Sequence, residues 1–114
     1  MSLVHVIKKY IPMTETAFYI LLSLTEPRHG YGIMNHVKEL TNERIKLGSG
    51  TVYGTLTKMQ RDGIISVSAD GKRKTIYEIT SIGRELITLE IDRLAELHNN
   101  GQKYKGVFDE DPPV

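Results

Sequence analysis

The stretch GSGTVYGTLTKMQRDG, residues 48–63, combines a helical core stripe with an opposite face that is polar and nearly bare. Val52, Leu56 and Met59 recur at i, i+4 and i+7, the spacing of one buried face of an α-helix. Gly54 stands inside the same helix, although an interior glycine costs about 1 kcal/mol relative to alanine. We therefore expect a helix whose outer face is kept free of side chains for close approach to another molecule.

Local signals also predict where this helix begins and ends. Ser49 is a favoured N-cap residue, and Gly63 stands where a left-handed C-terminal cap belongs. Gly50 then falls in the first turn, where glycine weakens a helix less than in its interior. The predicted outward arc contains small, hydroxylated and basic residues: Gly50, Thr51, Gly54, Thr57, Lys58 and Arg61.

Three further helices are predicted before this stretch. Residues 2–10 place apolar side chains on one helical face, and Pro12 ends that helix. Residues 14–26 are apolar on most sides, as expected for a helix in the middle of a core. A turn that contains Pro27 and two glycines then leads into a helix over about residues 31–42.

After Gly63 the apolar period changes from helical spacing to alternation, which predicts a two-stranded hairpin. Ile65 and Val67 alternate with serines in the first strand, and Tyr77 and Ile79 share one face of the second. An Asp-Gly pair typical of hairpin turns lies between the strands. Three consecutive cations follow at the predicted tip: Lys72, Arg73 and Lys74.

The last predicted helix begins at a cap formed by Thr80 or Ser81 and runs to about Asn99. Its apolar residues spread over about 200° of the helix circumference, which is wider than a single stripe facing its own domain. The same helix of a second copy is the simplest partner, and a helix clasped by the N-terminal helix is the alternative. We expect the dimer, with these contact residues: Leu3, Val6, Ile7, Tyr10, Leu86, Leu89, Ile91, Leu94 and Leu97.

Composition narrows the classes of protein to consider. The chain has 114 residues, which suits one small domain, and it has no cysteine, so disulfides and cysteine-ligated zinc are excluded. The four histidines have no metal-ligand spacing, and the acidic residues form no catalytic constellation. We expect no cofactor, no metal and no enzymatic activity. No apolar run reaches the roughly 20 residues of a membrane span, so we expect a cytoplasmic protein.

Charge is unevenly distributed along the chain. Residues 44–75 hold seven basic and two acidic residues, a balance of +5, whereas residues 76–114 hold four basic and eight acidic residues, a balance of −4. A basic segment of this kind is expected to face a polyanion. Chance clustering on a solvated face explains the charge equally well. The acidic end, residues 101–114, is predicted to be a disordered tail.

The order of the predicted elements is that of a winged helix-turn-helix. The predicted fold is therefore mainly α with a small β-hairpin. In this arrangement the third helix of the unit enters the major groove of DNA, and the hairpin tip reaches the flanking backbone. The predicted organisation has four parts: an N-terminal helix (1–12), the winged helix-turn-helix domain (13–80), a dimerisation helix (81–100) and the tail (101–114).

Three motifs resemble the PadR family of bacterial transcriptional regulators, and specifically its short-form members. They are HGYGI (29–33), GSGTVYGTLTKMQRDGII (48–65) and GKRKTIYEITSIGREL (71–86), within a match over roughly residues 13–98. The resemblance implies a homodimeric repressor that binds a palindromic operator and dimerises through its C-terminal helix. It also implies contacts of Tyr53 and Tyr31 with the DNA backbone. Family members often have proline where this chain has Gly54.

The predicted DNA-binding set follows from the helix face, the hairpin tip and the resemblance. Some relatives bind planar aromatic compounds through tryptophan, which this chain lacks, so a small aromatic or hydrophobic effector would need other contacts. The alternative function is a winged-helix module that binds protein rather than DNA. The predicted DNA contacts are Tyr31, Ser49, Gly50, Thr51, Tyr53, Gly54, Thr57, Lys58, Arg61, Lys72, Arg73 and Lys74.

Overall fold

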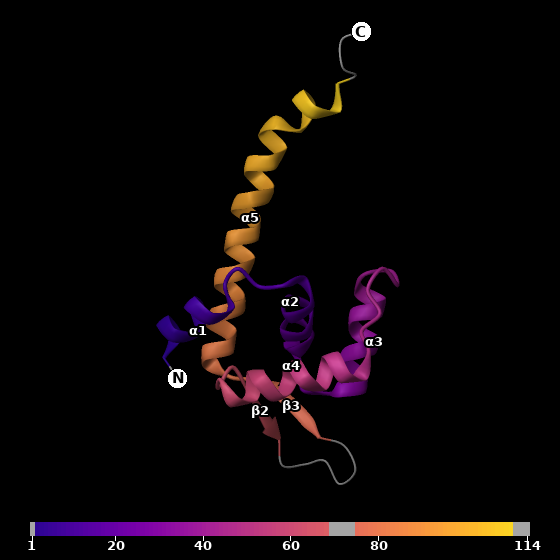
Figure 1. Cartoon of the computed structure of the whole chain (residues 1–114), viewed down its shortest axis with the longest axis vertical. Coiled ribbons are helices and arrows are strands. Elements are labelled where there is room, and N and C mark those ends of the chain that lie inside the picture. The colour runs from indigo at the N-terminus through magenta and orange to yellow at the C-terminus, as the bar shows by residue number, and fades with distance from the viewer. Residues whose placement is uncertain (1, 69–74, 111–114) are drawn as a thin grey trace.

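The computed structural model describes residues 2–68 and 75–110. Within these residues, five helices, a short 3₁₀ turn and three strands follow one another (Figure 1). Their bounds are α1 Leu3–Tyr10, α2 Glu15–Leu22, η1 Ser23–Thr25, β1 Arg28–His29, α3 Gly30–Leu40, α4 Ser49–Arg61, β2 Ile65–Ser68, β3 Ile76–Ile79 and α5 Ser81–Asp109.

The fold has two parts that differ in shape. Helices α2, α3 and α4 and the strands form the body, and α5 rises from it as a long rod with α1 across its base (Figure 1). The strands form one antiparallel sheet in the order β1-β3-β2. This arrangement confirms the predicted fold class, a mainly helical winged helix-turn-helix with a long C-terminal helix.

The predicted hairpin is present, and the sheet contains one more strand than expected. Strands β2 and β3 pair with Val67 opposite Tyr77. Arg28 and His29, predicted to lie in a turn, form β1 and pair with Tyr77 and Ile76. Two residues are too few to show the alternating pattern of a strand. Only the pairing with β3 makes this segment a strand. The predicted hairpin tip with Lys72, Arg73 and Lys74 lies outside the described residues.

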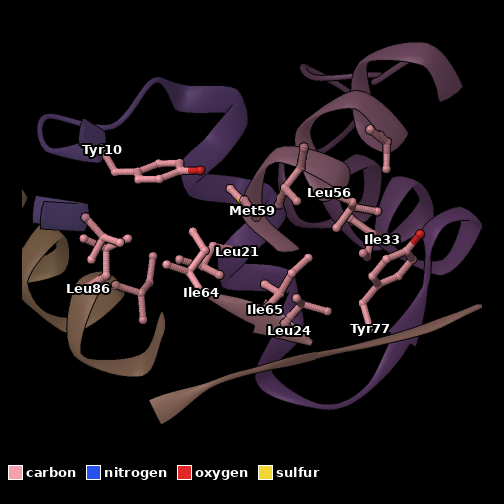
Figure 2. Close-up of a cluster of buried hydrophobic side chains, with 14 of the residues drawn as sticks. Tyr10, Leu21, Leu24, Ile33, Leu56, Met59, Ile64, Ile65, Tyr77 and Leu86 are labelled. Atoms are coloured by element: carbon pink, nitrogen blue, oxygen red, sulfur yellow. The ribbon is translucent and has the colours of Figure 1, made fainter. Parts of the chain in front are cut away.

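The core is built around the buried stripe of α4. Val52, Leu56 and Met59 are fully buried, as the sequence predicts. Figure 2 shows Leu56 and Met59 among buried side chains from the other helices and from the strand after α4. The position of α4 in the molecule is therefore set by its apolar face, which leaves the opposite face outward.

Helix α1 packs on α5 of its own protomer. Val6, Tyr10 and Leu86 are buried in the core of the single chain, and at most 7% of the surface of each residue is exposed. The prediction that these three residues contact a second copy is therefore wrong. An apolar helix face looks the same in the sequence whether it contacts a second copy or its own chain. Here α1 and α5 of one chain cover each other.

Three of the predicted helix-end features are present in the structure, and two differ from the prediction. Gly63 has φ +79°, the predicted left-handed cap, and the Thr80 hydroxyl caps α5 by accepting the N–H of Gly83. Pro12 follows the end of α1, as predicted. Ser49 is not the N-cap of α4, because Gly48 has the extended cap conformation and Ser49 begins the helix. Helix α3 ends at Leu40 rather than near Asn42, which has φ +50°.

Helix α5 is longer than predicted. It continues to Asp109, so the expected end near Asn99 and the expected disorder from residue 101 are wrong as far as Asp109. Gly101 and Gly106 each lower helix propensity by about 1 kcal/mol, but the residues between them, Gln102 to Lys105, include good helix formers. Two isolated glycines therefore do not end this helix.

A close backbone contact joins the end of α4 to the start of α5. The Thr80 N–H donates to the carbonyl of Ile64 at 3.1 Å, and the Thr80 hydroxyl donates to the carbonyl of Gly63 at 2.7 Å. A Cβ at Gly83 would lie 2.1 Å from the Ile64 carbonyl oxygen. We call this contact, formed by residues 63, 64, 80 and 83, the α4–α5 joint. It requires glycine at position 83.

Replacing Gly83 by alanine tests the joint. The added methyl group meets backbone that cannot move aside, so we expect Gly83→Ala to lower the free energy of unfolding by about 3 kcal/mol. Denaturation in urea measures this change. Gly106→Ala is the matched control, because no atom of the described residues lies within 4 Å of its added Cβ. Equal stability of the two variants would contradict the joint.

Candidate nucleic-acid interface

The outward face of α4 carries the predicted residues in the predicted arrangement. Its buried stripe faces the core, and the rest of the helix surface is open to solvent. No neighbouring element among the described residues covers this surface. The exposed members of the predicted set on α4 are Ser49, Gly50, Thr51, Tyr53, Gly54, Thr57, Lys58 and Arg61.

Two glycines on this face are not needed for packing within the protomer. At both Gly50 and Gly54, no atom of the described residues lies within 4 Å of the place where a Cβ would stand. Both have ordinary helical backbone, unlike Gly63. The loss of helix propensity at Gly54 is therefore not offset by any contact within the described residues, and a bare surface of this kind suits close approach by another molecule.

A third glycine, Gly30, links the first two sequence motifs. Gly30 begins α3, and the ring of Tyr53 on α4 packs against it. A Cβ added at Gly30 would lie only 2.6 Å from the nearest ring atoms of Tyr53. Tyr31 follows in the same turn and is 63% exposed, and Tyr53 is 44% exposed. The two tyrosines are thus presented at the N-terminal ends of α3 and α4. No pattern in the sequence indicates the contact between Gly30 and Tyr53.

The histidine of the first motif, His29, caps a helix. Its Nδ1 accepts the N–H of Gly32 at 3.0 Å and so caps the N-terminus of α3. A ring nitrogen that accepts a hydrogen bond carries no proton. The role of His29 in this structure is therefore to fix the start of α3 and, with it, the position of Tyr31.

Hydroxyl groups are placed both on and behind this face. The Thr57 hydroxyl donates to the Tyr53 carbonyl at 2.8 Å, so its lone pairs point away from its own helix. Burial raises the pKa of Tyr77 on β3, and the neighbouring Tyr53 raises it further. Tyr77 is therefore a neutral phenol behind the exposed Tyr53.

The cations of α4 lie toward its C-terminal end. The Lys58 ammonium stands over the ring of Tyr10, 5.5 Å from the ring centre. The Arg61 side chain is 68% exposed, with its Nε 4.0 Å from an oxygen of Asp62. At the other end, the first turn has no acidic residue, and no side chain among the described residues caps it. Its free N–H groups form a site suited to an anion.

A second exposed surface runs along α5. Leu89, Ile91, Leu94 and Leu97 are exposed apolar residues, as predicted, while Leu3 and Ile7 on α1 are half-buried. The sequence prediction missed the continuation of this surface because it ended the helix too early. Heptad spacing links the members of what we call the α5 seam: Leu94, Leu97, Tyr104 and Phe108.

In residues 2–68 and 75–110, no three histidine, aspartate or glutamate side chains gather closely enough to hold a metal ion. No helix within these ranges is both long and apolar enough to span a membrane. The exposed faces of α4 and α5 contain most of the residues singled out from the sequence.

Comparison with known proteins identifies relatives of this chain. It is 30% identical over 81 residues to an uncharacterized protein X of Lysinibacillus sphaericus, covering 67% of this chain and 73% of that protein. It is also 29% identical over 84 residues to an uncharacterized 37.1 kDa protein in a transposon of Streptomyces fradiae. That match covers 73% of this chain but spans only 24% of the longer relative.

Solved structures share the fold. A PadR family transcription regulator from Clostridium difficile superposes with a TM-score of 0.69 at 20% identity, over 80% of this chain and 98% of that one. Residues 20–89, more than half of this chain, match the sequence model described as the transcriptional regulator PadR-like family. The chain therefore belongs to the PadR-like family of transcriptional regulators.

Proposed function

We propose that this regulator is a homodimeric repressor that binds a palindromic operator through α4. The observation that supports this proposal most directly is the exposed face of α4, where Gly50 and Gly54 have no packing contact with the described residues. A smooth helix surface admits the walls of the major groove. Two protomers would place their α4 helices in half-sites about 34 Å apart.

The exposed groups on α4 match what DNA offers. Lys58 and Arg61 neutralise phosphates or reach guanine acceptors, and the hydroxyls of Thr51 and Thr57 serve phosphates or base edges. The uncapped first turn, which begins at Ser49, directs N–H groups toward a phosphate. The phenols of Tyr31 and Tyr53 and the cations Lys72, Arg73 and Lys74 complete the proposed contacts.

The dimer part of the proposal rests on α5. The α5 seam lies on the part of the helix that extends beyond the body, and Phe108 is 82% exposed. Apolar residues at heptad spacing are covered in stable proteins by a second helix with the same spacing. A second copy of α5 supplies that helix, and Leu89 and Ile91 extend the covered surface toward the body.

Release by an effector forms the last part of the proposal. An open, almost wholly apolar groove lies at the base of α5 and includes Leu89 of the proposed dimer contact. Pairing of two protomers would close it on one side, which would suit a small aromatic or hydrophobic molecule. The residues that line it are Leu3, Arg84, Glu85, Thr88 and Leu89.

Salt dependence tests DNA binding. We expect nanomolar to micromolar binding to the protein's own promoter that weakens linearly in a plot of log K against log salt concentration. Lys58→Ala and Arg61→Ala should each reduce that slope by about 0.9, one lost phosphate contact each. Fluorescence anisotropy at several salt concentrations measures this. Lys103→Ala, on exposed α5, is the control and should leave the slope unchanged.

Binding to DNA also separates this proposal from the protein-binding alternative. If the wild-type protein bound no duplex even at low salt, the exposed face of α4 would have to serve a protein partner instead. Unchanged slopes in both cationic variants, with binding intact, would show that α4 does not carry the DNA contacts.

The bare face has its own test. We expect Gly54→Ala to raise the free energy of unfolding by about 1 kcal/mol, because alanine favours the helix and its methyl group meets no protein atom among the described residues. The same variant should bind DNA more weakly, since the methyl group enters the proposed contact surface. Gly106→Ala should stabilise without affecting binding. Tighter DNA binding by Gly54→Ala would refute the close-approach explanation.

The proposed dimer is tested by sedimentation. Leu94→Asp and Leu97→Asp place a charge in the α5 seam, so each should convert a micromolar dimer into a folded monomer. Ala95→Asp adds the same charge to an exposed position of α5 beside the seam, and it should remain dimeric. A wild-type protein that sediments as a monomer at this concentration would contradict the proposal.

A further inference from the structure

Asp62 is placed against the local rules for a helix terminus. It is the C-cap of α4, where the helix dipole disfavours a negative charge, and it is 2% exposed. A buried carboxylate at such a position is retained only when groups from elsewhere in the fold stabilise it. The residues that bind the Asp62 carboxylate therefore identify the element to which the C-terminal end of α4 is attached.

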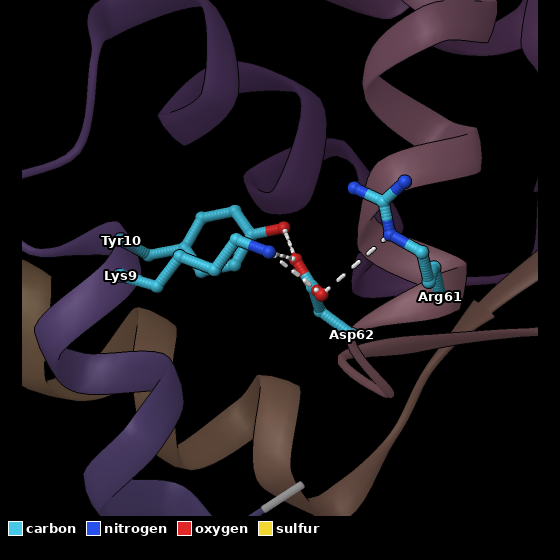
Figure 3. A network of polar contacts seen from close by, with 4 residues as sticks. All are labelled: Lys9, Tyr10, Arg61 and Asp62. Atoms are coloured by element: carbon cyan, nitrogen blue, oxygen red, sulfur yellow. Dashed lines mark hydrogen bonds and ion pairs between the residues drawn. The ribbon is translucent and has the colours of Figure 1, made fainter.

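Both hydrogen-bond donors to the Asp62 carboxylate come from the last turn of α1, whereas the Nε of Arg61 on α4 lies 4.0 Å from it. The Lys9 ammonium lies 2.9 Å from the carboxylate, and the Tyr10 hydroxyl donates to it at 2.6 Å (Figure 3). Burial by itself raises the pKa of Asp62, but the hydrogen bonds from Lys9 and Tyr10 outweigh it and leave that pKa below its usual value. Burial and the bond to Asp62 raise the pKa of Tyr10, so it remains a donor.

The chain just after these residues is attached to α5. The N–H of Met13 donates to Glu90 Oε2 at 2.7 Å, and Glu90 on α5 is 1% exposed. Arg93, one turn further along α5, holds the same oxygen with its Nη2 at 3.0 Å. We call residues 9–13 the strap. Within five residues it binds the end of α4 at one side and α5 at the other.

The strap and the α4–α5 joint connect the same two helices at separate places. At the joint, the carbonyl of Ile64 receives the first turn of α5 around Gly83. The joint holds α5 only at its first turn, so by itself it would still allow the angle between α4 and α5 to vary. The strap binds Asp62 and Glu90, which lies about two turns above Gly83 on α5, and so provides the second point.

We propose that the strap fixes the angle between α4 and α5, and that Lys9, Tyr10 and Asp62 are positioning residues for DNA recognition. This rests on the proposed function for its effect on DNA. In a dimer held by α5, the angle of each α4 sets the separation of the two recognition helices. Loosening the strap therefore relaxes the half-site spacing that the dimer requires, and Tyr10→Phe does so while keeping the ring that lies under Lys58.

The angle can be measured without DNA. Because the chain has no cysteine, Gln60→Cys on α4 and Asp92→Cys on α5 provide two exposed sites for spin labels. Diluting labelled with unlabelled protein restricts the measured distance to one protomer. We expect a narrow distribution in the parent protein and at least a twofold broader one after Tyr10→Phe or Lys9→Met, because two points of attachment become one.

Two control variants separate positioning from general loss of stability. Tyr19→Phe removes a hydroxyl on α2 outside the strap, and Ile20→Val weakens the core without touching residues 9–13. Both should keep the narrow distribution even if they lower the unfolding midpoint as much as Tyr10→Phe does. A narrow distribution in Tyr10→Phe and Lys9→Met as well would overturn the proposal and leave Asp62 a purely structural residue.

The DNA readout uses a duplex selected from a random pool by the wild-type protein. Changing its half-site separation by one base pair should weaken wild-type binding by about tenfold or more, because both protomers can no longer bind at once. For Tyr10→Phe that loss should shrink to about threefold, with affinity for a single half-site unchanged. An undiminished loss would refute the effect on spacing. If no duplex were selected, the proposed function would fail while the distance measurement still decided the strap.

Discussion

The carbonyl oxygen of Ile64 occupies the space that a side chain at position 83 would need, and Gly83 leaves that space free. This contact fixes where the first turn of α5 meets the end of α4. Thr80 adds hydrogen bonds from its N–H and its hydroxyl to the same short segment after α4. The strap then holds α5 at Glu90, about two turns further along, and the burial of Leu86 and Ile87 holds the turns between.

Helix α4 performs two tasks because its two faces have different compositions. The stripe of Val52, Leu56 and Met59 is fully buried and anchors the helix, so the opposite face can forgo side chains at Gly50 and Gly54. A surface of that kind is stable only when the anchoring face provides the missing stability. The Tyr53 ring, packed on Gly30, ties the start of α4 to α3. The proposed DNA contacts thus stand on a rigidly held helix.

Much of the fold was predictable because the elements that matter are long and periodic. The α4 stripe, the Gly63 cap and the paired strands β2 and β3 are local patterns, and each is present. The errors occurred where local patterns are ambiguous. Val6, Tyr10 and Leu86 are predicted to contact a partner subunit, but their own chain covers them. The prediction fails because an apolar helix face does not indicate which element packs on it. The end of α5 was misplaced because two glycines resembled a stop signal.

The sequence by itself determined the order of the elements, the buried face of α4 and the outward set that includes Thr51, Lys58 and Arg61, since helical and strand periodicities depend only on near neighbours in the chain. The tertiary structure alone decided the contacts between distant residues. These are the strand formed by Arg28 and His29, the packing of Tyr53 on Gly30, and the attachment of Asp62 to Lys9 and Tyr10. Each joins residues more than twenty positions apart, so no local pattern could specify it.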